Sequence, residues 1–146
     1  ISINWIPSDI DSYNGSHNGE NYIAYTFYIE NEGKQTVNYW YSVIIDDVIK
    51  NVDEAARVMI YFNGNKSVYA KVNSYTKEPE KDTFPFFNES TAVLEQRKDF
   101  KPGDIDKFTV VIWLEGDDED CTDNILGGEI KMHMEIREEY KDEESK

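Results

Sequence analysis

Carboxylate side chains gather between residues 115 and 123, and their types and spacing suit a metal site. Calcium takes about six to eight oxygen ligands and favours several carboxylates from one loop. The alternative is a solvent-exposed acidic loop, in a chain that is acidic along its whole length. No other cofactor is expected, and the candidate calcium ligands are Glu115, Asp117, Asp118, Asp120 and Asp123.

A second acidic segment resembles part of an EF-hand loop. Asp9, Asp11 and Glu20 stand at the first, third and twelfth positions of the EF-hand count. Tyr13 replaces the oxygen ligand at the fifth position, and Asn14 replaces the glycine that follows it. These departures favour a solvent-exposed turn.

The histidines and the single cysteine form no recognisable catalytic arrangement. His17 falls in a polar, turn-rich segment and His133 on the outward face of the last strand, so we expect both to be solvated. The acidic residues around Cys121 favour a raised thiol pKa and disfavour the thiolate. No His-Glu-x-x-His or Gly-x-Ser-x-Gly motif occurs. We therefore predict that the protein is not an enzyme, although two of its many carboxylates could still meet in a hydrolytic cleft.

The aromatic residues suggest a different activity. Exposed Tyr and Trp rings on a β-sandwich can stack against sugars, and the chain holds ten Tyr and three Trp. Successive residues of a strand point to opposite faces, so at least half of these rings are expected in the core. The rings in question are Tyr22, Tyr28, Tyr39, Trp40, Tyr41, Tyr61, Tyr69 and Tyr75.

The balance of charge excludes several classes of partner. Lys and Arg number 15 against 30 Asp and Glu, which gives a net charge of −15. Such a surface repels phosphate backbones and anionic membranes, so we predict no nucleic-acid binding. No apolar run approaches the ~20 residues of a membrane span, so no membrane insertion is expected.

The elements that position these residues are predicted to be strands. Aromatic and β-branched residues favour strands, and turn residues recur at intervals typical of an all-β domain. We predict a Greek-key or jelly-roll-like β-sandwich of about eight strands with one short helix over 46–56. The strands are expected near 1–5, 22–30, 36–45, 58–62, 68–72, 91–96, 108–114 and 130–136.

Several of these elements carry finer expectations. Asn63-Gly64 predicts a type I′ hairpin turn, and Pro102-Gly103 predicts a type II turn. The strands over 22–30 and 108–114 are apolar on both faces, which is typical of central strands. Phe84, Phe86 and Phe87 are expected to hold the long connection over 73–90 against the core.

The last strand alternates strictly between apolar and polar residues. We expect Ile130, Met132, Met134 and Ile136 to point inward, and Lys131, His133, Glu135 and Arg137 to point outward. We place a single domain over residues 1–137 and a charged, frayed tail over 138–146.

The tract from Phe100 to Ile136 resembles an uncharacterised group of exported Firmicutes proteins. The matching residues are Pro102-Gly103-Asp104, Trp113-Leu114-Glu115-Gly116, Asp118, Cys121 and Gly127-Gly128-Glu129-Ile130-Lys131. At greater distance the chain is similar to the camelysin and TasA type of secreted biofilm-matrix protein, which has a jelly-roll fold. Camelysin has been described as a metalloprotease, but this chain offers no standard zinc signature.

The resemblance implies a signal peptide removed before residue 1, an extracellular or cell-wall location in a Gram-positive bacterium, and assembly by strand exchange. We therefore expect a non-enzymatic secreted or cell-surface protein that acts in matrix assembly or adhesion. Its partner would be itself or a cell-surface or matrix component. The alternatives are a calcium-assisted carbohydrate-binding module and, less favoured, a camelysin-like peptidase.

Overall fold

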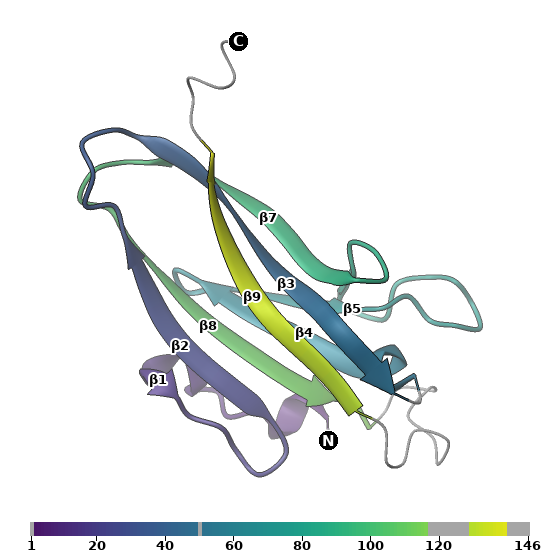
Figure 1. Ribbon diagram of the computed structural model, residues 1–146. Helices are drawn as coiled ribbons and strands as arrows, with labels where there is room; N and C mark the ends of the chain where they lie inside the picture. Colours follow the sequence, from purple (N-terminus) through teal and green to yellow (C-terminus); the bar gives the residue numbers. More distant parts are fainter. Residues whose placement is uncertain (1, 50, 117–128, 140–146) are drawn as a thin grey trace.

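Two β-sheets face each other in the structure, a computed structural model that describes residues 2–49, 51–116 and 129–139 (Figure 1). The predicted all-β sandwich is confirmed. The large sheet has six strands in the order β1-β2-β8-β4-β5-β6, and the small sheet has three in the order β7-β3-β9. Neighbouring strands are antiparallel except β5 and β6, which meet in parallel over two residue pairs.

The strands of the large sheet are β1 (Gly15–Ser16), β2 (Ile23–Glu30), β4 (Ala56–Phe62), β5 (Asn65–Ala70), β6 (Phe84–Pro85) and β8 (Ile105–Leu114). The strands of the small sheet are β3 (Val37–Ile49), β7 (Thr91–Phe100) and β9 (Glu129–Glu139). Three short 3-10 helices complete the described elements: η1 (Ile3–Trp5), η2 (Ile10–Ser12) and η3 (Val52–Glu54).

Aromatic rings fill the space between the two sheets. Phe108 of β8 is fully buried, and its ring meets Tyr41 edge-on at 4.9 Å and stacks on Phe27 at 5.1 Å between ring centroids. Tyr39 and Phe100 form a further edge-on pair at 5.1 Å. Each such pair adds about 0.5–1.5 kcal/mol beyond the area that it buries, so these rings fix how the sheets face each other.

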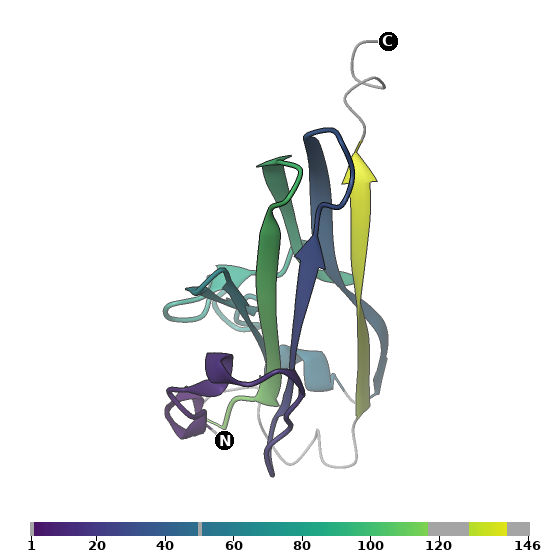
Figure 2. The ribbon, with the colours of Figure 1, turned by 90° about the vertical axis from the view of Figure 1, so that its left-hand side faces the viewer.

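The N-terminal segment forms a third layer on the far face of the large sheet (Figure 2). Ile10 of η2 packs there with Met59, Val111 and Trp113, all of them buried. Because this layer covers the far face of the large sheet, β4 and β8 are apolar on both faces. The expectation that the strand over 108–114 is a central strand, apolar on both faces, is confirmed.

The predicted helix over 46–56 is wrong. β3 continues to Ile49 along β9, the single turn η3 follows, and β4 begins at Ala56. The described residues contain no α-helix. A short run of β-branched residues such as Val48 and Ile49 fits a strand as well as a helix, and pairing with β9 decides between them.

Three smaller expectations also need correction. Residues 3–5 form the turn η1 and not a strand. β2 is not buried on both faces, because Ile23 and Tyr25 are 58% and 51% exposed. β8 pairs with one side of this strand, but only the two-residue β1 pairs with the other. Of the three phenylalanines in the long connection, only Phe86 is buried, whereas Phe84 and Phe87 are exposed.

Both predicted turns are confirmed. Asn63 and Gly64 link β4 to β5 with φ values of 48° and 85°, as a type I′ turn requires. Gly103 has φ 86°, and the Asp104 amide donates to the Lys101 carbonyl at 2.9 Å.

The predicted faces of β9 are confirmed along most of its length. Ile130, Met132 and Met134 pack against the core between the sheets, whereas Ile136 on the same face is 41% exposed. Lys131, His133, Glu135 and Arg137 are exposed on the other face. β9 runs to Glu139, two residues past the expected end of the domain at residue 137, and residues 140–146 lie outside the described residues.

Candidate functional site

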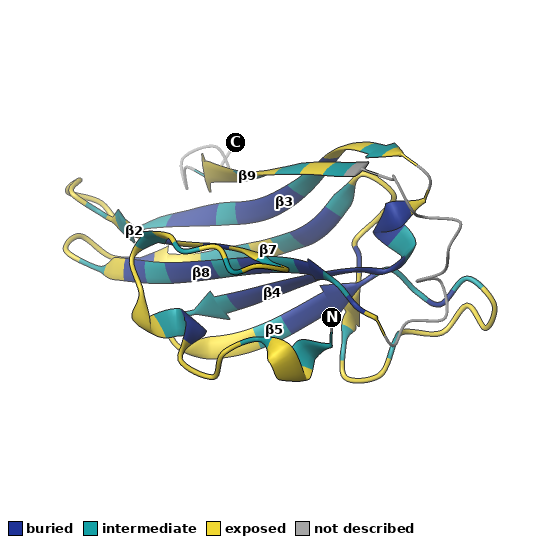
Figure 3. Ribbon diagram, turned by 90° about the horizontal axis from the view of Figure 1, so that it is seen from below, coloured by how far each residue is buried: buried dark blue, intermediate teal, exposed yellow. Residues whose placement is uncertain are grey.

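The most distinctive surface of the molecule is the edge of β9. This strand is 11 residues long and pairs with β3 on one side, and no strand in the described ranges pairs with its other side. From Ile130 to Glu139, β9 is intermediate or exposed beside the largely buried β3 (Figure 3). A long unpaired edge presents free N–H and C=O groups on which another strand can form.

β2 flanks the same open side of the sandwich (Figure 2). β1 pairs only with Tyr25 and Thr26, so among the described strands the rest of this edge of β2, from Phe27 to Glu30, stays unpaired. A groove of about 270 Å³ lies at the end of this opening. We call this groove the β2–β9 seam. It is lined by Ile29, Glu30, Asn31, Glu32, Gly33, Val37, Tyr39, Phe100, Ile136 and Glu138.

The seam has an apolar floor and an acidic rim. Ile29 and Val37 belong to the partly buried residues around the core, and Phe100 is almost fully buried beneath them. Glu30, Glu32 and Glu138 bring three carboxylates to the rim. The floor therefore suits aliphatic side chains of an added segment, and the rim disfavours a negatively charged one.

A buried polar network supports the seam from below. The carboxylate of Asp106, 1% exposed, accepts hydrogen bonds from the Tyr39 hydroxyl at 2.6 Å, Arg97 Nε at 2.9 Å and Asn63 Nδ2 at 2.9 Å. Burial alone would raise the pKa of Asp106, but the hydrogen bonds from Arg97, Tyr39 and Asn63 outweigh it and lower the pKa below its ordinary value. The network fixes Tyr39, whose ring lines the seam.

A bulge in β3 places a carboxylate beside the exposed histidine of β9. The register shifts between Ile45 and Asp47, which leaves Asp46 as the extra residue. Asp46 Oδ2 lies 2.6 Å from His133 Nδ1, and Glu135 Oε2 lies 2.7 Å from His133 Nε2. These hydrogen bonds, that of Asp46 first, raise the pKa of His133. The three groups tie β9 to β3 on the outer face.

Glu115 is the one candidate calcium ligand within the described residues. It is buried, and its Oε1 accepts from the Ile3 amide at 2.9 Å and from Trp113 Nε1 at 3.3 Å. Asp117, Asp118, Asp120 and Asp123 lie outside the described residues, so the calcium loop stays a prediction. Within the described ranges, no group of three or more His, Cys, Asp or Glu residues is arranged to hold a metal ion.

The cleft next to Glu115 is polar and measures about 460 Å³. Arg57 lies buried in its wall and pairs with Glu80 at 3.5 Å. Trp113 and the N-terminal residues Ser2 to Asn4 close other sides. The hydrogen bond from the Ile3 amide to Glu115 holds the N-terminal layer against the large sheet at this cleft.

Asp9 and Asp11 of the EF-hand-like segment form polar contacts with other side chains of the protein. Asp11 Oδ1 accepts from Thr109 Oγ1 at 2.6 Å and lies 3.5 Å from Lys107 Nζ, and Asp9 accepts from the Tyr13 hydroxyl. His17 differs from the expectation of a solvated side chain. It is half-buried, with Nε2 2.9 Å from Thr26 Oγ1 and a buried Nδ1 that has no partner among the described residues.

The candidate sugar-stacking rings separate into core and surface. Tyr39, Tyr41 and Tyr69 are buried, and Tyr22 and Tyr61 pack against the core between the large sheet and the N-terminal layer. Tyr28 and Tyr75 are exposed, and Trp40 lies half-buried on the outer face of the small sheet. Trp40 is the ring that sequence reasoning did not separate from the others, because its face depends on the register of β3.

The chain matches no protein-family model, no curated protein and no solved structure. Among the described residues, no helix has the length and the apolar character needed to cross a membrane.

Proposed function

We propose that this chain is a non-enzymatic β-sandwich protein that assembles with copies of itself, or attaches to a surface component, through the β2–β9 seam. The observation that carries the proposal is the edge of β9, which pairs with β3 alone within the described residues. An extended segment added at this edge gains main-chain hydrogen bonds, and alternate side chains reach pockets beside the edge.

The seam supplies those pockets. An added strand would turn every second side chain toward Ile29, Phe100 and Ile136, which line the groove. Ile136 is 41% exposed in the monomer, so covering it removes apolar surface from water. Main-chain bonds would then provide affinity and the seam would select apolar side chains.

Charge would regulate this assembly. The net charge of −15 keeps separate molecules apart at low ionic strength, and the glutamates on the rim repel one another across an interface. The screening length falls from about 30 Å at 0.01 M to about 3 Å at 1 M salt. Assembly is therefore expected to increase with salt, with divalent cations and with acidification.

We propose that this assembly takes place outside the cell or on the cell wall, after removal of a signal peptide. This location rests on the resemblance of the tract from Phe100 to Ile136 to exported Firmicutes proteins. A role in an extracellular matrix would follow from it.

Light scattering across ionic strength, calcium concentration and acid pH tests the proposal. The wild-type protein should grow in mass as the charges are screened. Ile136→Lys places a charge in the seam, and we expect it to raise the protein concentration needed for assembly at least about tenfold, which is about 1.4 kcal/mol. Because Ile136 is already partly exposed, the monomer should remain folded.

Ile105→Lys is the matched control. Ile105 is 57% exposed and lies on the same face of β8 as Thr109, which points away from the seam. The Ile105→Lys variant should assemble like the wild type. A wild-type protein that stays monomeric under every condition, or assembly that Ile136→Lys leaves unchanged, would overturn the proposal.

A further inference from the structure

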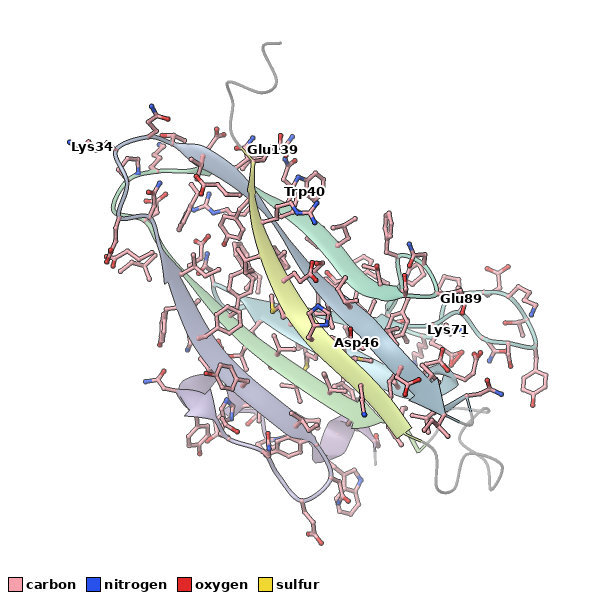
Figure 4. All side chains as sticks on the ribbon, viewed as in Figure 1. Lys34, Trp40, Asp46, Lys71, Glu89 and Glu139 are labelled. Atoms are coloured by element: carbon pink, nitrogen blue, oxygen red, sulfur yellow. The ribbon has the colours of Figure 1, made fainter. Side chains whose placement is uncertain are left out.

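A hollow on the outer face of the small sheet lies apart from the seam. It measures about 350 Å³, near the lower end of the ~300–1,000 Å³ range of small-molecule sites. Figure 4 shows Trp40 and Glu139 together near the end of β9 on this face. The hollow belongs to neither the aromatic core nor the edge of β9.

The strand register builds the hollow from three rows of side chains. The first row is Gln96, Trp40 and Arg137, and the second is Leu94, Ser42 and Glu135. The third is Thr91, Ile44 and His133. Side chains directly opposite each other in such rows stand about 4.5–5.5 Å apart. Ser42 is the smallest residue of the set, so the space above it stays open between Trp40 and Ile44.

Trp40 is held rigidly at one end of this hollow. Its Nε1 donates to Glu139 Oε2 at 2.6 Å, and Gln96 Nε2 donates to the same oxygen at 3.1 Å. Three strands therefore fix the plane of the indole before any ligand arrives. A ligand that stacks on a preorganised ring loses less conformational freedom in binding.

The composition of the hollow selects its ligand. Trp40, Ile44 and Leu94 give an apolar surface, and Ser42, Thr91, Glu135 and Arg137 place polar groups around it. The charges of Glu135 and Arg137 oppose each other, and the net charge of −15 repels polyanions. A neutral ligand with one apolar face and hydroxyl groups at its edge meets both conditions.

We propose that this hollow, the Trp40 groove, binds a neutral hexose residue of a polysaccharide. The C–H face of the sugar ring lies on Trp40, and Arg137 and Glu135 hydrogen-bond its hydroxyls. This site goes beyond assembly at the seam and does not depend on it.

Calorimetric titration with three neutral hexose oligosaccharides (cellohexaose, maltohexaose and laminarihexaose) tests this site at low ionic strength. At least one of them should bind the wild-type protein. Trp40→Ala should weaken that binding at least about tenfold through loss of the stacking surface. Ser42→Leu should weaken it similarly, because leucine fills the hollow while Trp40 stays in place.

Trp5→Ala is the matched control, because Trp5 is 75% exposed and lies in the N-terminal layer beyond the large sheet. It should bind like the wild type, and thermal unfolding of each variant shows whether the fold is retained. If the Trp40→Ala variant is unfolded, oligosaccharide binding by the folded Ser42→Leu variant decides whether the hollow is the binding site. The inference is overturned if none of the oligosaccharides binds, or if binding survives both substitutions in folded protein.

Discussion

Asp106 is the residue on which the folded structure depends most clearly. Its carboxylate is 1% exposed, and two strands and a turn supply its partners: Tyr39 from β3, Arg97 from β7 and Asn63 from the β4–β5 turn. Since β3 and β7 belong to the small sheet and β8 to the large one, this single group links the two layers.

Replacing Asp106 should therefore destabilise the protein. Asp106→Asn keeps the shape but removes the charge that Arg97 pairs with, and we expect a loss of roughly 3 kcal/mol in the free energy of unfolding. Urea titration measures it. Asp104→Asn is the control, because Asp104 is a more exposed partner of Arg97 at 3.4 Å and should cost less than about 1 kcal/mol.

The same group predicts how stability depends on pH. The pKa of Asp106 is lower in the folded protein than in the unfolded chain, so its contribution is complete above the unfolded value of about 4. It is lost as the pH falls through the folded pKa. Asp106→Asn should therefore flatten the decline in stability below about pH 4, and an unchanged decline would contradict this role.

At the scale of the elements, the β4–β5 hairpin can be tested through its turn. Gly64 has φ 85°, and a Cβ atom added there would meet no atom within 4 Å, so only backbone strain opposes a side chain. Gly64→Ala should lower the free energy of unfolding by about 1–2 kcal/mol, as measured by thermal unfolding. Gly64→Asn should cost less, because asparagine adopts positive φ more readily. Equal losses in the two variants would contradict a cause in the backbone.

The strands could be predicted where a two-residue period or a turn signal was present. Met132 and Met134 lie on the expected face of β9, and Asn63-Gly64 forms the expected turn. The prediction of a helix over 46–56 was wrong because a short run of β-branched residues fits a strand as well as a helix. The bulge that brings Asp46 to His133 leaves no local mark in the sequence.

The seam and the Trp40 groove could not be predicted from the sequence. The seam depends on which strands lie at the sheet edges, and strand order is set by contacts between residues far apart in the chain. The Trp40 groove depends on the register that places Ser42 between Leu94 and Glu135. Core composition and turn chemistry are local properties, whereas these surfaces are not.

At the scale of the whole molecule, three layers and a strong negative charge account for the behaviour that we propose. The N-terminal layer covers the far face of the large sheet, and β1 covers only part of the edge of β2. Between β2 and β9 the sandwich stays open over an apolar floor. The net charge of −15 opposes contact between molecules until salt or cations screen it.

Hydrogen exchange of the assembled protein, compared with the monomer at low ionic strength, tests the assembly surface most directly. If a strand adds at the seam, amides of β9 and of β2 from Phe27 to Glu30 should exchange more slowly in the assembly, because their N–H groups gain partners. Amides of β7, at the opposite edge of the small sheet, should exchange at the same rate in both states. Protection confined to β7, or none at β9, would contradict assembly through the seam.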